Sequence, residues 1–178
     1  MTIRKATPND IQAIATIYDL LHTEEEQGKN PIGWTRGVYP TRQTAEQALR
    51  EDNLFVLEDQ DKVIAAARIN QAQDPAYRDA KWTYPAPDSE VMVLHTLVVD
   101  PRMKGHGYGK AFVAFYEQYA RTHHCPVLRM DTNARNRAAR ALYAHLGYHE
   151  ADIIPLRLQR HPQRPTGLSR ETALVVRP

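Results

Sequence analysis

The sequence predicts a single mixed α/β domain, in which amphipathic helices alternate with short strands. Its 178 residues are enough for one domain, residues 1–178, with a sizeable core. Apolar residues make up 42% of the chain and charged residues 25%, which is typical of globular proteins. Stretches with the period of a strand and stretches with the period of a helix follow one another, so both should pack around one core.

The N-terminal part should supply a strand and two helices. Thr2 to Lys5 alternates as a short strand, and Pro8-Asn9-Asp10 then has the residue types that start a helix. Glycines and prolines break the next stretch, from Glu24 to Pro40. A second helix is expected from about Thr41 to Glu51, with Thr44 and Gln47 as a capping box. The buried stripe of the first helix should be Ile11, Ile14, Tyr18 and Leu21.

A hairpin and a long strand should follow. Leu54 to Leu57 and Val63 to Ile69 are apolar runs that a short polar turn separates, which is typical of a β-hairpin. Ala72 to Asp88 holds three prolines and predicts a surface loop. Glu90 to Val99 is the longest strand-like run.

The C-terminal half continues the alternation. Helices are expected from about Gly109 to Thr122 and from Asn136 to Leu146, the second ended by Gly147. Strands are expected at Val127 to Asp131, Ala151 to Leu158 and Glu171 to Arg177. The stretch from His161 to Ser169 is compatible with an ordered flap or with a loose loop.

The segment from Val91 to Ala111 carries the strongest functional signal. An apolar strand ends at Asp100-Pro101, three alternating glycines follow (Gly105, Gly107, Gly109), and a helical pattern starts at once. Such a turn presents unpaired backbone N–H groups and the positive end of a helix dipole at one point. Side chains would keep a phosphate away from that backbone, so glycine suits the turn. The segment therefore predicts an anion site, best matched by a pyrophosphate.

Two common phosphate loops do not fit this segment. The dinucleotide fingerprint needs a third glycine where this chain has Lys110. The nucleotide-triphosphate loop needs a glycine at Lys104 and Ser or Thr at Ala111. Both interpretations fail.

A basic residue followed by G-x-G-x-G instead resembles the pyrophosphate loop of the GCN5-related N-acetyltransferase (GNAT) superfamily. A second segment, Asn136 to Tyr148, resembles that family's N-x-x-A-x-x-L-Y-x-x-x-G-F/Y motif, and a strand pattern lies between the two. The clear resemblance covers about Val91 to Tyr148, whereas the N-terminal part matches only in its order of elements. It implies a central, mostly antiparallel mixed sheet of about seven strands with a splayed parallel pair, flanked by about four helices.

The resemblance also implies which residues bind acetyl-CoA. The backbone of Leu97, Val98 and Val99 would pair with the pantetheine arm like an added strand. Lys104 stands where the family has Gln or Arg, which keeps the charge but loses a planar donor. Asn136 is either a helix N-cap or a contact to cofactor or acceptor, and Asn133 is a weaker candidate for both. The backbone amides that would hold the pyrophosphate belong to Gly105, His106, Gly107, Tyr108, Gly109 and Lys110.

Two side chains are candidate catalytic groups. Tyr143 matches the motif tyrosine, which would donate a proton to the departing thiolate, and the alternative is a core tyrosine. His95 matches a histidine of serotonin N-acetyltransferase that removes the amine proton through water, and the alternative is a hydrogen-bonded core residue. In the family, a bulge at Thr96-Leu97 would aim the Leu97 N–H at the acetyl oxygen. Holding the two substrates together could itself supply much of the rate.

The acceptor is expected to be a primary amine of a small molecule. Aromatic residues of two irregular segments could line its site, or could simply cover the core. A peptide N-terminus or a lysine is an alternative acceptor. A CoA-binding sensor or interaction module without chemistry is the alternative from another class. The candidate substrate residues are Trp34, Tyr39 and Tyr84, with Trp82 beside them.

Composition limits the kinds of partner that the sequence predicts. A net charge of +2 is too small to predict nucleic-acid binding. One cysteine, Cys125, and the lack of a signal peptide or spanning segment predict a cytoplasmic protein that does not enter a membrane. His123-His124-Cys125 lacks further ligands, so no metal is expected. A homodimer is common in the superfamily. Basic residues gather around the proposed loop, namely Arg102, Lys104, Lys110, Arg129, Arg135, Arg137 and Arg140.

Overall fold

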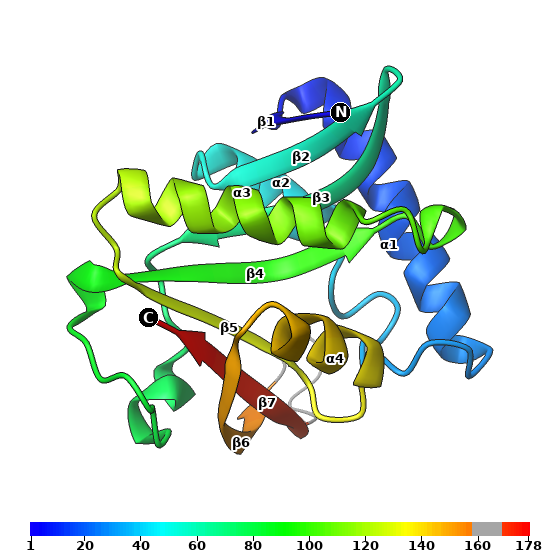
Figure 1. The fold of residues 1–178 in the computed structure, drawn as a ribbon. Helices are drawn as coiled ribbons and strands as arrows, with labels where there is room; N and C mark the ends of the chain where they lie inside the picture. The colour runs from blue at the N-terminus through cyan, green and yellow to red at the C-terminus, as the bar shows by residue number, and fades with distance from the viewer. Residues whose placement is uncertain (158–168) are drawn as a thin grey trace.

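A computed structural model describes residues 1–157 and 169–178 and arranges their strands in one sheet with helices on both faces (Figure 1). Among these residues the sheet has seven strands in the order β1-β2-β3-β4-β5-β7-β6. The predicted fold class is confirmed. The strands are β1 (Thr2–Lys5), β2 (Leu54–Asp59), β3 (Lys62–Asn70), β4 (Val91–Val99), β5 (Val127–Asn133), β6 (His149–Arg157) and β7 (Ser169–Arg177).

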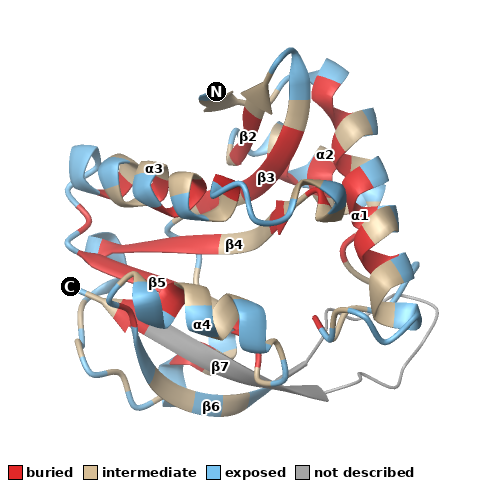
Figure 2. Cartoon of the chain, turned by 45° about the vertical axis from the view of Figure 1, so that its right-hand side comes forward, coloured by how far each residue is buried: buried red, intermediate tan, exposed pale blue. Residues whose placement is uncertain are grey.

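One pair of strands, β4 and β5, is parallel, and every other described pair is antiparallel. The parallel ladder runs from Val91 opposite Val127 to Leu94 opposite Met130 and stops there. Beyond Leu94 the two strands diverge (Figure 2). The splay that the resemblance implied is therefore present.

A β-bulge interrupts β4 where this divergence begins. Ala66 of β3 lies opposite Val98, whereas Arg68 lies opposite His95, so Thr96 and Leu97 together face one residue of β3. Thr96 has a φ of 53°, in the left-handed region. The bulge shifts the alternation of β4, so that Leu97 packs on the same core cluster as Met92 and Leu94.

Helices cover both faces of the sheet. On one face α1 (Ile11–Glu26) and α2 (Arg42–Arg50) pack on β2 and β3, with the expected stripe residues buried. On the other face α3 (Tyr108–Thr122) and α4 (Arg137–His145) pack on a larger cluster (Figure 1). Buried residues line the inner sides of these helices (Figure 2).

Two helix starts differ from the sequence prediction. α3 begins at Tyr108, just before the predicted Gly109, because Gly107 has a φ of 80° and ends the loop as the N-cap. The capping box of α2 is formed by Thr41 and Thr44, not by Thr44 and Gln47. Thr41 precedes the helix with extended backbone, and its side chain accepts the Thr44 N–H.

The segment between β3 and β4 is more than the predicted surface loop. It contains 3-10 helices at Pro75–Asp79 and Asp88–Glu90. Tyr77 is only 2% exposed and packs in a cluster with Val91 and Val127. This part of the sheet lies beyond the α1 and α2 cluster, and the segment buries its apolar side chains instead.

The end of the chain adds β7 between β5 and β6. The predicted flap or loop from His161 onward lies outside the described residues up to position 168, and Ser169 begins β7. Within the described ranges, no helix has the length and apolar content that crossing a bilayer requires.

Candidate active site

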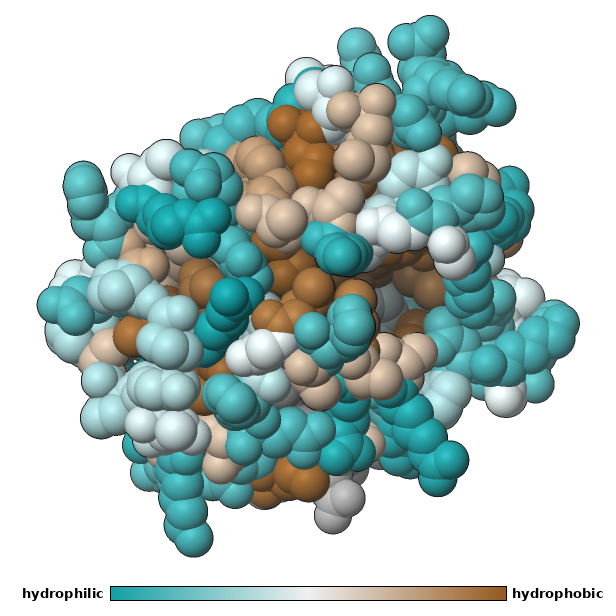
Figure 3. Space-filling model, in the orientation of Figure 1, coloured by the Kyte–Doolittle hydropathy of each residue, from teal (hydrophilic) through white to brown (hydrophobic). Residues whose placement is uncertain are grey.

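A cleft of about 1120 Å³ opens where β4 and β5 diverge. Its walls come from the ends of both strands, the loop before α3, the first turns of α4 and the segment after α1. Figure 3 shows the surface hollowed beside α1, with hydrophobic residues around the hollow. Pockets of this size at a strand opening are the default place for a ligand.

The loop before α3 has the open backbone that the predicted anion site would need. Asp100 ends β4 with its side chain accepting the Arg102 N–H at 2.9 Å, and Gly107 then turns the chain into α3. Among the described residues, no backbone carbonyl accepts the N–H groups of positions 105 to 110. These donors and the start of a 15-residue helix suit a diphosphate.

The side chains of this loop contribute less than its backbone. The Lys104 ammonium lies 2.7 Å from a carboxylate oxygen of Glu24, so part of its charge is already balanced. His106 stacks on Tyr108 and turns its Nδ1 toward the Lys104 carbonyl at 3.0 Å. The side chains of His106 and Lys110 are exposed, and neither residue lines the cleft. A diphosphate would thus be held mainly by backbone amides.

The structure keeps part of the basic cluster that the sequence indicated: Lys104, Arg135, Arg137 and Arg140 line the cleft, whereas Arg102, Lys110 and Arg129 do not. Arg102 pairs with Asp100, and Arg140 pairs with Glu150. Arg129 does not lie near the loop at all, because it alternates to the other face of β5 and contacts Trp82. Asp100 is only two residues from Arg102, whereas the tertiary structure brings Arg140 and Lys104 to partners 10 and 80 residues away.

The backbone of Leu97, Val98 and Val99 borders the cleft on the β4 side. This stretch pairs with β3 on one edge, while its ladder to β5 has already ended at Leu94. The other edge can therefore take hydrogen bonds from a ligand amide. Leu97 and Val99 side chains pack on the core, so both predicted roles of this stretch are compatible.

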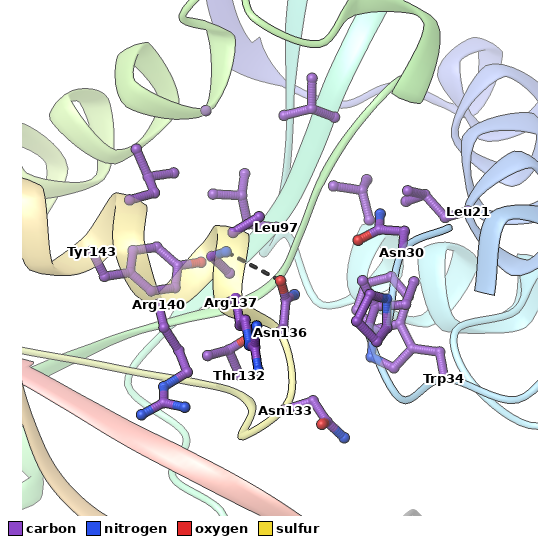
Figure 4. A pocket seen from close by; sticks show the side chains of 18 of the residues that line it. Leu21, Asn30, Trp34, Leu97, Thr132, Asn133, Asn136, Arg137, Arg140 and Tyr143 are labelled. Atoms are coloured by element: carbon purple, nitrogen blue, oxygen red, sulfur yellow. Dashed lines mark hydrogen bonds between the residues drawn. The ribbon is translucent and has the colours of Figure 1, made fainter. Parts of the chain in front are cut away.

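On the opposite wall, α4 carries Asn136 and Tyr143. The Asn136 side chain accepts the Ala139 N–H at 3.1 Å, so the N-cap role is present, and the residue also lines the cleft (Figure 4). Tyr143 is 6% exposed and extends from α4 toward Leu97 (Figure 4). Burial, and the nearby charge of Asp131, raise the pKa of the Tyr143 phenol above its ordinary value, so it stays protonated.

His95 lines the cleft from β4. Its Nε2 lies 3.1 Å from Oδ1 of Asn70. Burial lowers the pKa of His95 to about 4, although the charge of Asp131 acts in the other direction. The imidazole is therefore neutral at physiological pH and is a weaker base than an ordinary histidine.

Asp131 is a site residue that the sequence reasoning missed. It follows directly on the buried part of β5 and lines the cleft, and its Oδ1 accepts a hydrogen bond of 2.7 Å from the Tyr77 hydroxyl. Its charge acts on the pKa of both His95 and Tyr143. A lone carboxylate ending a strand pattern was the available signal, but only the parallel pairing of β5 with β4 brings it beside His95.

The structure brings two of the predicted acceptor residues to the cleft and leaves two outside it. Trp34 and Tyr39 line it, with their rings 6.1 Å apart edge to face, and the Tyr39 hydroxyl hydrogen-bonds Thr96 at the bulge. Figure 4 shows Trp34 across the cleft from Tyr143. Tyr84 and Trp82 pack instead on the cluster around Tyr77. They cover core, which was the alternative for aromatic residues in loops.

Gly33 lets the Trp34 segment approach β5, and Gly33→Ala should destabilise the protein. Gly33 has a φ of 74°, and an added Cβ would lie 1.9 Å from Nδ2 of Asn133, whose side chain is buried. The expected cost is about 2 kcal/mol, or roughly 4–8 °C in Tm, measured by thermal unfolding.

Gly37→Ala is the matched control for this change. Gly37 has a φ of 72°, but nothing lies within 4 Å of its added Cβ. Gly37→Ala should lower the free energy of unfolding by about 1 kcal/mol, which is the cost of the left-handed backbone conformation alone. Equal losses for the two variants would mean that the close approach to Asn133 contributes nothing.

A seven-stranded sheet that opens between its two parallel strands is the architecture that the resemblance to acetyltransferases implied. The model of the Acetyltransferase (GNAT) family matches residues 14–148, and the chain belongs to this family. Within the described residues, no group of three or more His, Cys, Asp or Glu side chains has the arrangement of a metal site.

Known relatives agree with this assignment. An uncharacterised N-acetyltransferase of Methanocaldococcus jannaschii is 22% identical over 159 residues, and the match covers 86% of this chain and 62% of the relative. This chain therefore spans less than two thirds of that protein's length.

Solved structures share the fold. A GNAT-family acetyltransferase from Streptococcus agalactiae matches with a TM-score of 0.78 at 18% identity, over 99% of this chain and 95% of that one. The ribosomal-protein-S18-alanine N-acetyltransferase of Escherichia coli matches with a TM-score of 0.65 at 21% identity, over 98% and 91% of the two chains.

Proposed function

We propose that this protein is an N-acetyltransferase, which transfers acetyl from acetyl-CoA to a primary amine of a small molecule by direct attack in a ternary complex. The observation that carries the proposal is the opening of β4 from β5 after Leu94, beside unpaired amides at the start of α3. One ligand with a diphosphate and an amide-bearing arm would satisfy both groups of donors and acceptors.

Acetyl-CoA supplies an activated thioester, whose carbonyl carbon bonds to the amine nitrogen as the C–S bond breaks. Tyr143 keeps its proton until negative charge builds on sulfur and then donates it. The Leu97 N–H, at the bulge, is our candidate donor to the carbonyl oxygen. Asp131 attracts the cationic amine and, with His95, accepts its proton through water.

The acceptor half of the cleft supports a small substrate. The Trp34 segment closes one side, because Gly33 packs on Asn133 and Tyr39 is tied to Thr96. Trp34 and Tyr39 would contact the carbon skeleton of the amine, and Asp131 its charge.

His95 provides a pH test of the proton route. Because its pKa is lowered to about 4, the ring is neutral above about pH 5 and contributes no ionisation near neutrality. His95→Gln should lower kcat/KM by about tenfold or less and leave the shape of the pH profile between about pH 5 and 8 unchanged. Disappearance of an ionisation near pH 6.5 in this variant would contradict the lowered pKa. His124→Gln, an exposed change outside the cleft, is the control.

A peptide N-terminus or lysine is the second candidate acceptor. The similarity to the Escherichia coli ribosomal-protein-S18-alanine N-acetyltransferase favours it. Thioester consumption should be measured with a panel of small amines and of peptides with free N-termini. Turnover restricted to peptides would replace the small-molecule proposal.

A CoA-binding sensor without chemistry is the rival from another class. Calorimetry with acetyl-CoA and the same amine panel separate the two. Binding without turnover of any acceptor would favour the sensor, and failure to bind any CoA derivative would end both interpretations. A cytoplasmic location and a homodimer stay predictions, to be tested by cell fractionation and by light scattering.

A further inference from the structure

A second pocket, of about 540 Å³, lies beneath the segment between β3 and β4. None of the described residues that line it also lines the cleft between β4 and β5, which is the acyl cleft of the proposed function. Its wall combines apolar side chains with the guanidinium of Arg129, which extends from β5. The lining residues used below are Gln73, Tyr77, Trp82, Pro85, Ala86 and Arg129.

Arg129 is a buried cation whose hydrogen-bonding partners are all neutral. It is 5% exposed. Its Nη1 donates to Oε1 of Gln73 at 2.5 Å, and its Nη2 donates to the Tyr84 carbonyl at 3.3 Å. The Trp82 ring lies 4.0 Å from the guanidinium carbon. Within the described part of the chain, Nε has no hydrogen-bond partner.

The guanidinium of Arg129 has no anionic hydrogen-bond partner among the described residues. Burying a charge without a directly paired counter-ion is costly, and burial lowers the pKa of Arg129, although the charge of Asp88 acts in the other direction. The long Nη2 contact and the unpartnered Nε belong to one guanidinium edge, and that edge matches the two oxygens of a carboxylate.

We propose that this pocket binds a small planar organic carboxylate, with its two oxygens on Nε and Nη2 of Arg129 and its body against Trp82, Pro85 and Ala86. The carboxylate displaces the weak contact to the Tyr84 carbonyl. Asp74 and Asp88 also line the pocket and repel any anion in proportion to its charge, so a monoanion fits better than a phosphate dianion. The site requires nothing of the acyl cleft.

Tyr77 connects this pocket with the acyl cleft. Its carbonyl accepts the Trp82 indole N–H at 2.8 Å, and its hydroxyl donates to Asp131 at 2.7 Å. A ligand packed on Trp82 is therefore linked to Asp131 through two side chains, those of Trp82 and Tyr77.

Trp82 itself can report binding. The chain has two tryptophans, so Trp34→Phe leaves Trp82 as the sole indole fluorophore. Benzoate is the probe, and benzamide is its neutral isostere. Benzoate should change the fluorescence in a saturable way, whereas benzamide at equal concentration should not. No response to benzoate, or an equal response to both, would overturn the proposal, and this comparison needs no change at Arg129.

Arg129→Met, in the same background, removes the guanidinium and keeps an unbranched side chain about as long as the aliphatic stem of arginine. It should weaken benzoate binding by at least about tenfold. Arg78→Met removes an exposed arginine from the rim of the same pocket and should change binding by less than about twofold. Equal affinities in Arg129→Met and its parent would exclude the proposed contact. Circular dichroism establishes that each variant is folded.

Discussion

Replacing Tyr143 with phenylalanine should lower kcat by about 10²-fold or more, while the affinity for acetyl-CoA stays nearly unchanged. The change removes only the hydroxyl of a ring that is 6% exposed and packed in the main core, so the fold should persist. Because the raised pKa keeps this phenol protonated, its loss withdraws the proton donor for the departing thiolate. Steady-state kinetics and calorimetry with acetyl-CoA measure the two quantities.

Tyr148→Phe is the matched control. The Tyr148 ring lies 6.2 Å from that of Tyr143 and is equally buried, but its hydroxyl donates to Glu117 and it does not line the cleft. Its kcat should stay within about twofold of the parent. Unchanged turnover in Tyr143→Phe would remove the acid role from Tyr143 and leave it as a core residue.

Replacing Asp131 with asparagine should lower kcat/KM for the amine by about 10²-fold. The amide is nearly isosteric and can still accept from the Tyr77 hydroxyl, so the local packing is kept. What disappears is the negative charge that attracts an ammonium group and that takes part in removing its proton. Kinetics over a range of amine concentrations, at saturating acetyl-CoA, provide the measurement.

Asp74→Asn tests whether a nearby carboxylate outside the cleft has the same effect on the reaction as Asp131. The charge of Asp74 also acts on His95 and on Tyr77, but Asp74 lies outside the cleft, with its side chain accepting the Ala76 N–H. An effect below about threefold is expected. If the two variants lost activity equally, the role of Asp131 would be long-range electrostatics rather than contact with the amine.

Much of the fold could be predicted because its signals are local. The stripe Ile11, Ile14 and Leu21 required one helix face to be buried, and Gly107 ended the loop before α3 whatever packed around it. The segment from Ala72 to Asp88 was predicted less well. Its prolines indicated a loop, but the sheet surface that it covers is assembled from β4, β5 and β7, which the sequence does not place together.

Some parts of the candidate site could likewise be predicted from local signals, and others could not. The amide loop and Tyr143 belong to short motifs, so their presence was predictable. The residues that pair with the side chains around this loop and around Tyr143 were not predictable. Lys104 meets Glu24 and Tyr77 meets Asp131, each pair distant along the chain.

Local signals alone predicted a mixed α/β domain with a glycine-rich loop at the start of a helix, since the turn at Gly107 depends mainly on nearby residues. Long-range packing was needed to place Asp131 beside His95, Tyr84 and Trp82 over the core, and Arg129 under a separate pocket. These outcomes depend on strand order and on the phase of the bulged strand, which arise from contacts between distant segments.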